Sequence, residues 1–164
     1  MKKVAVLLGS DSDLKRVGGC FKKLDEYGIE YEAHIISAHR TPEAAADFAK
    51  NAKENGFGVI IAAAGMAAHL AGAIAARTVL PVIGIPCSGS VSGLDALLST
   101  VQMPPSIPVA TVSIDGGKNA AVLAAQILAL EDEELYKKLT LERQSLSEEV
   151  TAKDAALGEK IAQL

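Results

Sequence analysis

Short aliphatic runs alternate along this chain with longer segments in which apolar residues recur at helical spacing. Aliphatic runs without polar interruption are typical of parallel strands that are buried on both faces. The pattern predicts five strands, at about residues 4–8, 30–36, 59–64, 81–86 and 109–114. It predicts helices at about residues 12–26, 41–55, 67–77, 94–100 and 118–130, and helical structure from residue 132 onward.

Five strand–helix units in series predict an α/β fold, in which one parallel sheet is covered by helices on both faces. We expect a single domain over residues 1–164, a three-layer α/β/α sandwich whose five strands follow a flavodoxin-like order. A chain of this length can bury roughly two-thirds of its unfolded surface in one core.

The extra C-terminal helices, residues 132–164, have no strand left to cover, so their apolar side chains need another surface. These positions are Leu135, Leu139, Leu146, Val150, Leu157 and Ile161. Packing on a neighbouring subunit and folding back onto the same domain are both open.

Composition and charge exclude several classes of partner. The chain is 49% hydrophobic but only 4% aromatic and has no Trp, which leaves few platforms for stacking on nucleic-acid bases. The formal net charge of -4 also disfavours binding to nucleic acid. No stretch has the length and composition of a membrane span, and no basic, apolar leader opens the sequence. We therefore expect a cytoplasmic protein with no nucleic-acid and no membrane partner.

The turn after the first strand has the sequence Gly-Ser-Asp-Ser-Asp at residues 9–13. Gly9 lets the backbone approach an anion, and Ser10 and Ser12 place hydroxyls beside a helix N-terminus, which favours negative charge. Asp11 and Asp13 would repel a phosphate, so at least one of them better accepts hydrogen bonds from sugar hydroxyls. The turn is neither a P-loop nor a dinucleotide fingerprint. Ordinary helix capping by Ser or Asp is the alternative explanation.

The second candidate turn is Ser-Ala-His-Arg-Thr-Pro at residues 37–42. His39 can exchange protons near neutral pH, and Arg40 can hold a phosphate through two parallel hydrogen bonds. Thr41 can cap a helix and Pro42 suits its first position, so this turn also joins a strand to a helix. Because such junctions meet at one edge of an open α/β sheet, we predict that this turn contributes to a ligand site. The alternative is a surface histidine beside a solvated arginine.

The third candidate turn lies within residues 62–70, where small residues surround Gly65 and precede His69. A lone histidine at the start of a small-residue helix is more often a packing residue than a catalyst, and His34, within a strand, is predicted to be structural. The histidines are dispersed and have no cysteine or carboxylate at ligand spacing, so no metal site is predicted.

The two cysteines, Cys20 and Cys87, have neither metal-ligand spacing nor a CxxC motif. Both are predicted to be reduced and buried, and nothing near Cys87 in the sequence lowers its pKa enough to favour a nucleophile. The Gly/Ser-rich stretch at residues 88–93 is interpreted as a lid over the site, with a plain connector as the alternative.

Together the three turns resemble one family. The segments GSDSD at 9–13, SAHRTP at 37–42 and AAAGMAAHLAG at 62–72 are similar to those of the class I N5-carboxyaminoimidazole ribonucleotide mutases of purine biosynthesis. Further similar segments follow in the right order at residues 92–104, 107–112 and 118–128. The resemblance thus spans about residues 3–130.

The resemblance implies an isomerase with a flavodoxin-like fold that assembles as a homo-octamer and uses no metal or organic cofactor. The reaction would move a carboxylate from the exocyclic nitrogen of a ribonucleotide to ring carbon C4, with His39 as the general acid/base. Ser12 and Ser37 would help Arg40 hold the phosphate, and Asp13 would accept from the ribose. The substrate-binding positions implied by the motifs are Ser10, Ser12, Asp13, Ser37, Ala38, Arg40, Ala64, Gly65, His69 and Leu70.

Two residues depart from the commonest pattern of that family, since Met66 replaces a glycine and Ala71 a proline. Met66 could narrow the pocket or point into the core. The class II relatives, which carboxylate aminoimidazole ribonucleotide directly with CO2, have lysine after the motif histidine and lack the AAHL element, so Arg40 and His69 favour class I. A direct CO2-using carboxylase and a non-catalytic nucleotide-binding module of the same fold are the alternatives to a mutase.

Overall fold

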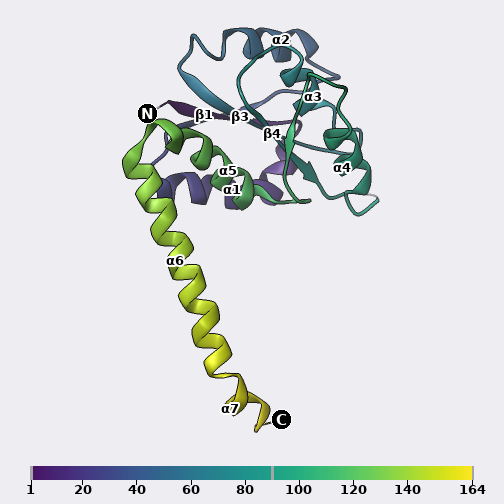
Figure 1. Cartoon of the computed structure of the whole chain (residues 1–164). Helices are drawn as coiled ribbons and strands as arrows, with labels where there is room; N and C mark the ends of the chain where they lie inside the picture. Colours follow the sequence, from purple (N-terminus) through teal and green to yellow (C-terminus); the bar gives the residue numbers. More distant parts are fainter. Residues whose placement is uncertain (1, 90, 164) are drawn as a thin grey trace.

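The sheet of the protein is parallel throughout and lies between two layers of helices (Figure 1). The computed structural model describes residues 2–89 and 91–163. The strands are β1 (Lys3–Leu8), β2 (Tyr31–Ile35), β3 (Phe57–Gly65), β4 (Val82–Cys87) and β5 (Ala110–Thr111). Their order across the sheet is β2-β1-β3-β4-β5, and each neighbouring pair is parallel. The predicted α/β sandwich with a flavodoxin-like strand order is confirmed.

Helices cover both faces of the sheet (Figure 1). α1 (Leu14–Tyr27) and α5 (Gly117–Leu128) pack on the first face, and α2 (Pro42–Asn51), α3 (Leu70–Ala75) and α4 (Leu94–Val101) pack on the second. The 3-10 turns η1 (Asp11–Asp13) and η2 (Ala129–Glu131) precede α1 and follow α5, and the chain ends in α6 (Glu133–Ala155) and α7 (Leu157–Ile161). None of the helices in the described part of the chain is long and apolar enough to span a bilayer.

The boundaries of three elements differ from those predicted. α2 was expected to reach residue 55 but ends at Asn51, and turns then lead to Gly56 in the left-handed region at φ 85°. α3 begins at Leu70 rather than at residue 67, because the chain first makes a left-handed turn at Met66. β5 pairs over only two residues at the edge of the sheet, so the run at 109–114 is mostly extended chain without a ladder.

The core explains why the strands read as continuous aliphatic runs. In β1, Val4 and Val6 point into the layer under α1 and α5, whereas Ala5 and Leu7 point into the opposite layer. All four side chains are fully buried. A strand that must be apolar on both faces cannot alternate polar and apolar residues, which is the pattern of a parallel sheet covered on two sides.

The final helices project away from the sandwich (Figure 1). Asp132 caps α6 by accepting a hydrogen bond from the Leu135 backbone N–H at 2.9 Å, and Leu135 is buried. Lys23 of α1 then forms an ion pair with Glu142 at 2.7 Å, and the Tyr27 hydroxyl donates to the same carboxylate. These contacts fix the base of α6 against α1.

Beyond those contacts the apolar side chains of α6 and α7 are exposed. Leu139 is half-buried against the domain. The exposed positions are Leu146, Val150, Leu157 and Ile161. Folding back onto the same domain, one of the two interpretations of residues 132–164, is therefore wrong for this distal part.

We expect Gly84→Ala in β4 to lower stability. A Cβ at residue 84 would lie 2.3 Å from Thr100 Cγ2 and 3.0 Å from Val109 Cγ1, and overpacking of a core typically costs about 1–3 kcal/mol. Gly18→Ala in α1 is the matched control, because a Cβ there meets nothing within 4 Å and Ala favours a helix over Gly by about 1 kcal/mol. Urea unfolding at one protein concentration measures both. If Gly84→Ala unfolded at the urea concentration of the parent protein, this account of the packing between β4 and α4 would be wrong.

Candidate functional site

A pocket of about 620 Å³ lies at the carboxyl ends of β1, β2, β3 and β4. Every residue that the family motifs implicate in catalysis or binding lines it, whereas Asp11 and Cys87 are not among its lining residues. The implicated residues are Ser10, Ser12, Asp13, Ser37, Ala38, His39, Arg40, Ala64, Gly65, His69 and Leu70. The strand order brings the three turns together, because the chain leaves β1 toward β2 and returns on the other side to β3, and ligands bind at such a reversal.

The first turn is held by its own hydroxyls. The Ser10 side chain accepts from the Ser12 backbone N–H at 3.3 Å and caps η1, so helix capping is confirmed for Ser10. The Ser12 hydroxyl lies 3.1 Å from the Ser10 hydroxyl, and Ser10 also donates to Asp11 at 3.1 Å. Both serines still line the pocket, so capping and ligand binding are compatible at these positions.

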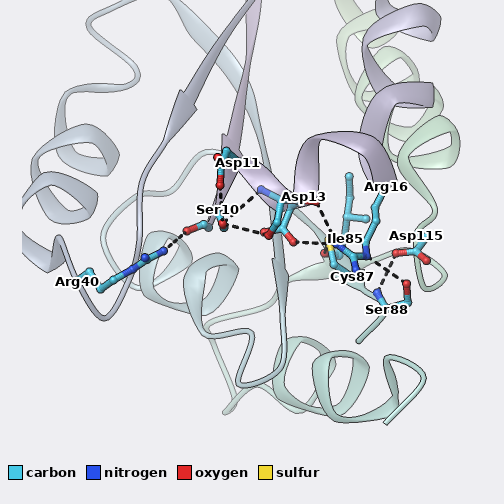
Figure 2. Close-up of polar contacts among 11 residues, drawn as sticks. Ser10, Asp11, Asp13, Arg16, Arg40, Ile85, Cys87, Ser88 and Asp115 are labelled. Atoms are coloured by element: carbon cyan, nitrogen blue, oxygen red, sulfur yellow. Dashed lines mark hydrogen bonds and ion pairs between the residues drawn. The ribbon is translucent and has the colours of Figure 1, made fainter. Parts of the chain in front are cut away.

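Asp13 is the buried acid of the site, with 7% of the residue exposed. Burial raises the pKa of its carboxyl above the ordinary value, and the Arg16 guanidinium, 3.8 Å away, partly offsets this. The carboxyl also contacts the Cys87 thiol (Figure 2). A buried carboxylate with so few strong donors around it has acceptor capacity left for the hydroxyls of a ligand.

Arg40 ties the second turn to the first. Its Nη2 donates to the Gly9 carbonyl at 3.1 Å and its Nε to the Ser37 hydroxyl at 3.4 Å. Figure 2 shows the guanidinium extended toward the turn that contains Ser10. Among the residues that the structure describes, no carboxylate forms an ion pair with Arg40, so its full positive charge faces the pocket.

Thr41 does not cap α2 as its position predicts. Its hydroxyl accepts from the Ser37 backbone N–H at 3.0 Å and donates to the Ser37 carbonyl at 3.1 Å, and it makes no capping bond. The backbone of Ser37 offers a donor and an acceptor together, which a helix N-terminus does not. The hydroxyl thereby closes the loop that presents Ala38, His39 and Arg40.

The two pocket histidines contact each other. Nε2 of His39 lies 2.8 Å from Nδ1 of His69, and the rings meet edge to face with centroids 4.9 Å apart. One ring nitrogen supplies the proton of this hydrogen bond and the other the lone pair. His69 is exposed on the pocket wall, so the packing role suggested by its spacing is wrong. His34, by contrast, lies on β2 outside the pocket, with its ring against Phe48.

The third turn is built from small residues except at Met66. Met66 is in the left-handed region at φ 55°, a conformation that costs an L-residue about 1–2 kcal/mol and glycine almost nothing. Its side chain is 65% exposed and lines the pocket, so the alternative that it points into the core is wrong. Ala71, the other unusual position, is a residue of α3 and is buried in the core.

The sequence interpretation missed Arg16 and Asp115 at the edge of the site. Arg16 lines the pocket and donates to the Ser12 carbonyl at 3.1 Å and to the Ser88 hydroxyl at 3.3 Å (Figure 2). The Ser88 N–H donates to Asp115 at 2.8 Å, and Gly89 also lines the pocket. Arg16 could have been found because it follows Asp13 by three residues on one helix face.

Ser88 and Gly89, at the start of the stretch 88–93, line this pocket, and residue 90 falls outside the described residues. The lid interpretation stays a prediction.

The thiols of both cysteines are buried, as predicted. Burial raises the pKa of Cys20 to about 12. Burial, together with the carboxylates of Asp13 and Asp115, raises the pKa of Cys87 to about 12. A buried thiol with a raised pKa stays protonated near neutral pH, which disfavours Cys87 as an activated nucleophile.

Comparison with known proteins gives consistent matches. Residues 3–149 match the family model described as AIR carboxylase. A Methanocaldococcus jannaschii protein named N5-carboxyaminoimidazole ribonucleotide mutase is 49% identical over 156 residues, which cover 95% of this chain and 98% of that protein. A Pyrococcus abyssi protein of the same name is 52% identical over 147 residues, covering 89% of this chain and 84% of that one. The crystal structure of PurE from Treponema denticola matches with a TM-score of 0.85 at 31% identity, covering 94% of this chain and 97% of that one.

Proposed function

Because the chain belongs to the AIR carboxylase family, we infer that it catalyses the N5-carboxyaminoimidazole ribonucleotide mutase reaction of purine biosynthesis. The observation that carries this conclusion is an identity of about half, over nearly the whole chain, to proteins that bear this name. The enzyme is therefore an isomerase, since the carboxylate that leaves one atom of the substrate is regained by another.

We propose that the ribonucleotide binds through its phosphate at Arg40 and through its ribose at Asp13. Arg40 is held in place by neutral oxygens only, so its charge is available to an anion. Ser37 lies beside it and Ser12 lines the same pocket, so both can donate hydroxyl hydrogens to that anion. Asp13 is an acceptor at the buried end of the same pocket, which suits sugar hydroxyls and disfavours a second anion.

The reaction has two proton transfers, in which one proton is donated to the substrate and one is later removed from it. Protonation of the exocyclic nitrogen breaks the N–C bond of the carbamate and releases CO2 and the free amine of the aminoimidazole. Carbon C4 of the electron-rich ring then attacks CO2, a C–C bond forms, and the proton on C4 leaves. A single group that donates the first proton and accepts the last leaves the protein unchanged after each turnover.

His39 is the residue proposed for both transfers. It lies in the pocket between the phosphate-binding side at Arg40 and the small-residue turn at Ala64 and Gly65. Its contact with His69 holds the ring in one orientation, which makes His69 a positioning residue as well as a lining one. Ala38, Ala64, Gly65 and Leu70 supply small or apolar surface that suits the imidazole ring and the CO2 formed from it.

We also propose that the protein is a cytoplasmic homo-octamer in which residues 132–164 pack on a neighbouring subunit. The exposed apolar side chains of α6 and α7 support this, because a projecting helix with such a surface gains stability only from a further partner. Sedimentation at micromolar protein concentration should show an oligomer, and a monomer under these conditions would contradict the proposal.

We expect His39→Asn to abolish turnover while nucleotide binding changes little, because Asn keeps a polar side chain of similar reach but cannot carry a proton. Turnover and Kd for a product analogue measure the two effects. His34→Asn is the matched control, since His34 lies outside the pocket on β2 and should retain full activity. Near-normal turnover in His39→Asn would refute the acid/base role.

The substrate assay separates the mutase from its alternatives. Purified protein receives N5-carboxyaminoimidazole ribonucleotide in one sample, and aminoimidazole ribonucleotide with bicarbonate in another, and formation of the C4-carboxylated product is followed by absorbance. Fast product only in the first sample is expected. Fast product only in the second would assign a direct CO2-using carboxylase, and no product in either would leave a nucleotide-binding module.

A further inference from the structure

We propose that Met66 closes the mouth of the pocket over CO2 and thereby decides how much of it is recaptured at C4 rather than lost. This inference rests on the proposed mutase reaction, and it assigns a role to a residue that the acid/base chemistry leaves unused. Met66 is the one long side chain among the small residues 62–68 of the third turn, and it departs from the glycine of the commonest family pattern.

The backbone is the first observation behind this assignment. Met66 is left-handed at φ 55°, directly after the last residue of β3 and before the buried Ala68. Glycine adopts this conformation without steric cost, whereas a residue with a Cβ does not. Residue 66 therefore carries a side chain although its backbone conformation favours glycine. Backbone strain of this kind is found most often at functional sites.

The surroundings of the side chain are the second observation. Met66 is 65% exposed, so burial in the core of its own chain does not offset the strained backbone. The same side chain lines the pocket together with Gly65, Ala67 and His69. The thioether of Met66 is therefore positioned to act on a molecule bound in this pocket.

The chemistry explains what a thioether contributes there. Between cleavage of the N–C bond and formation of the C–C bond, CO2 is a small neutral molecule that makes no strong hydrogen bond. The pocket keeps it only by blocking its exit. Methionine is flexible, polarisable and apolar, so it can cover an opening without offering a competing proton or charge. Removing it leaves the cleavage of the N–C bond and the formation of the C–C bond intact but opens a path for CO2 to escape.

The test follows the label of the migrating carboxylate. Substrate carrying 13C at that carboxylate is incubated with enzyme in unlabelled bicarbonate, with carbonic anhydrase present so that escaped CO2 equilibrates at once. Mass spectrometry then gives the 13C content of the C4-carboxylated product and the amount of aminoimidazole ribonucleotide released. A parallel incubation without enzyme corrects for carboxylate lost in solution.

Three variants separate the effect of the Met66 side chain from the effect of the left-handed backbone. Met66→Leu keeps the apolar bulk and should retain the label as the parent enzyme does. Met66→Ala and Met66→Gly should both lose label several-fold more and release more aminoimidazole ribonucleotide, with His39 still in place. Met66→Gly alone relieves the left-handed strain, so its Tm should rise above that of Met66→Ala by about 2–4 °C.

Each other outcome overturns the assignment in a distinguishable way. Equal label retention in all variants would remove the role of Met66 while leaving the mutase reaction established. Label loss in Met66→Gly but not in Met66→Ala would make the rigidity of the turn responsible, not the side chain. A changed sedimentation pattern in the variants would make Met66 a subunit contact instead. A parent enzyme that fails to convert the labelled substrate would refute the proposed function itself.

Discussion

The position of β1 between β2 and β3 is the constraint on which the site depends. Leu8 pairs with Ile35 on one side and with Ala63 on the other, so β1 and β2 end at one level and β3 continues to Gly65 beside them. The first turn is then joined to both neighbours by the backbone itself, because Gly9 donates to the Ala63 carbonyl and Ile36 donates to the Leu8 carbonyl, each at 2.9 Å. The hydrogen bond from Arg40 to the Gly9 carbonyl only reinforces an arrangement that the pairing of the strands has already established.

The sequence predicts the strands and the site edge for one physical reason. A strand buried on both faces has to be aliphatic along its whole length, and the chain can become polar only where the strand ends. The change from Leu8 to Gly9 therefore predicts where β1 stops and where its ligand-facing turn begins. The edge strand β2 carries an exposed His34 and does not follow this rule. Family resemblance adds the role of the turn after β1, but its location follows from the pattern alone.

What the sequence leaves open depends on contacts between distant segments. His39 and His69 are thirty residues apart. Their contact follows from the register of β1 with its neighbours and from the left-handed turn at Met66. Neither feature is signalled by the local sequence, since a methionine does not indicate a left-handed turn. Thr41 is a good cap by propensity, yet the backbone of Ser37 offers its hydroxyl two hydrogen bonds. The direction of α6 could not be predicted from the spacing of its apolar residues, because that spacing does not indicate which surface covers them. Where α6 leaves the domain is instead decided by Lys23 and Glu142.

The twenty-three residues of α6 thus form two stretches that stay helical for different reasons. The first turns are held by the Asp132 cap, the buried Leu135 and the ion pair with Lys23, so their amide hydrogens exchange only when the domain itself opens. The outer turns, around Val150, have only local helix-forming tendency within their own chain, and an isolated helix of that length is marginal in water. Hydrogen exchange along α6 would consequently report, residue by residue, on the proposed association between subunits. The outer amides become as slow as the inner ones only when protein concentration rises and a second molecule covers them.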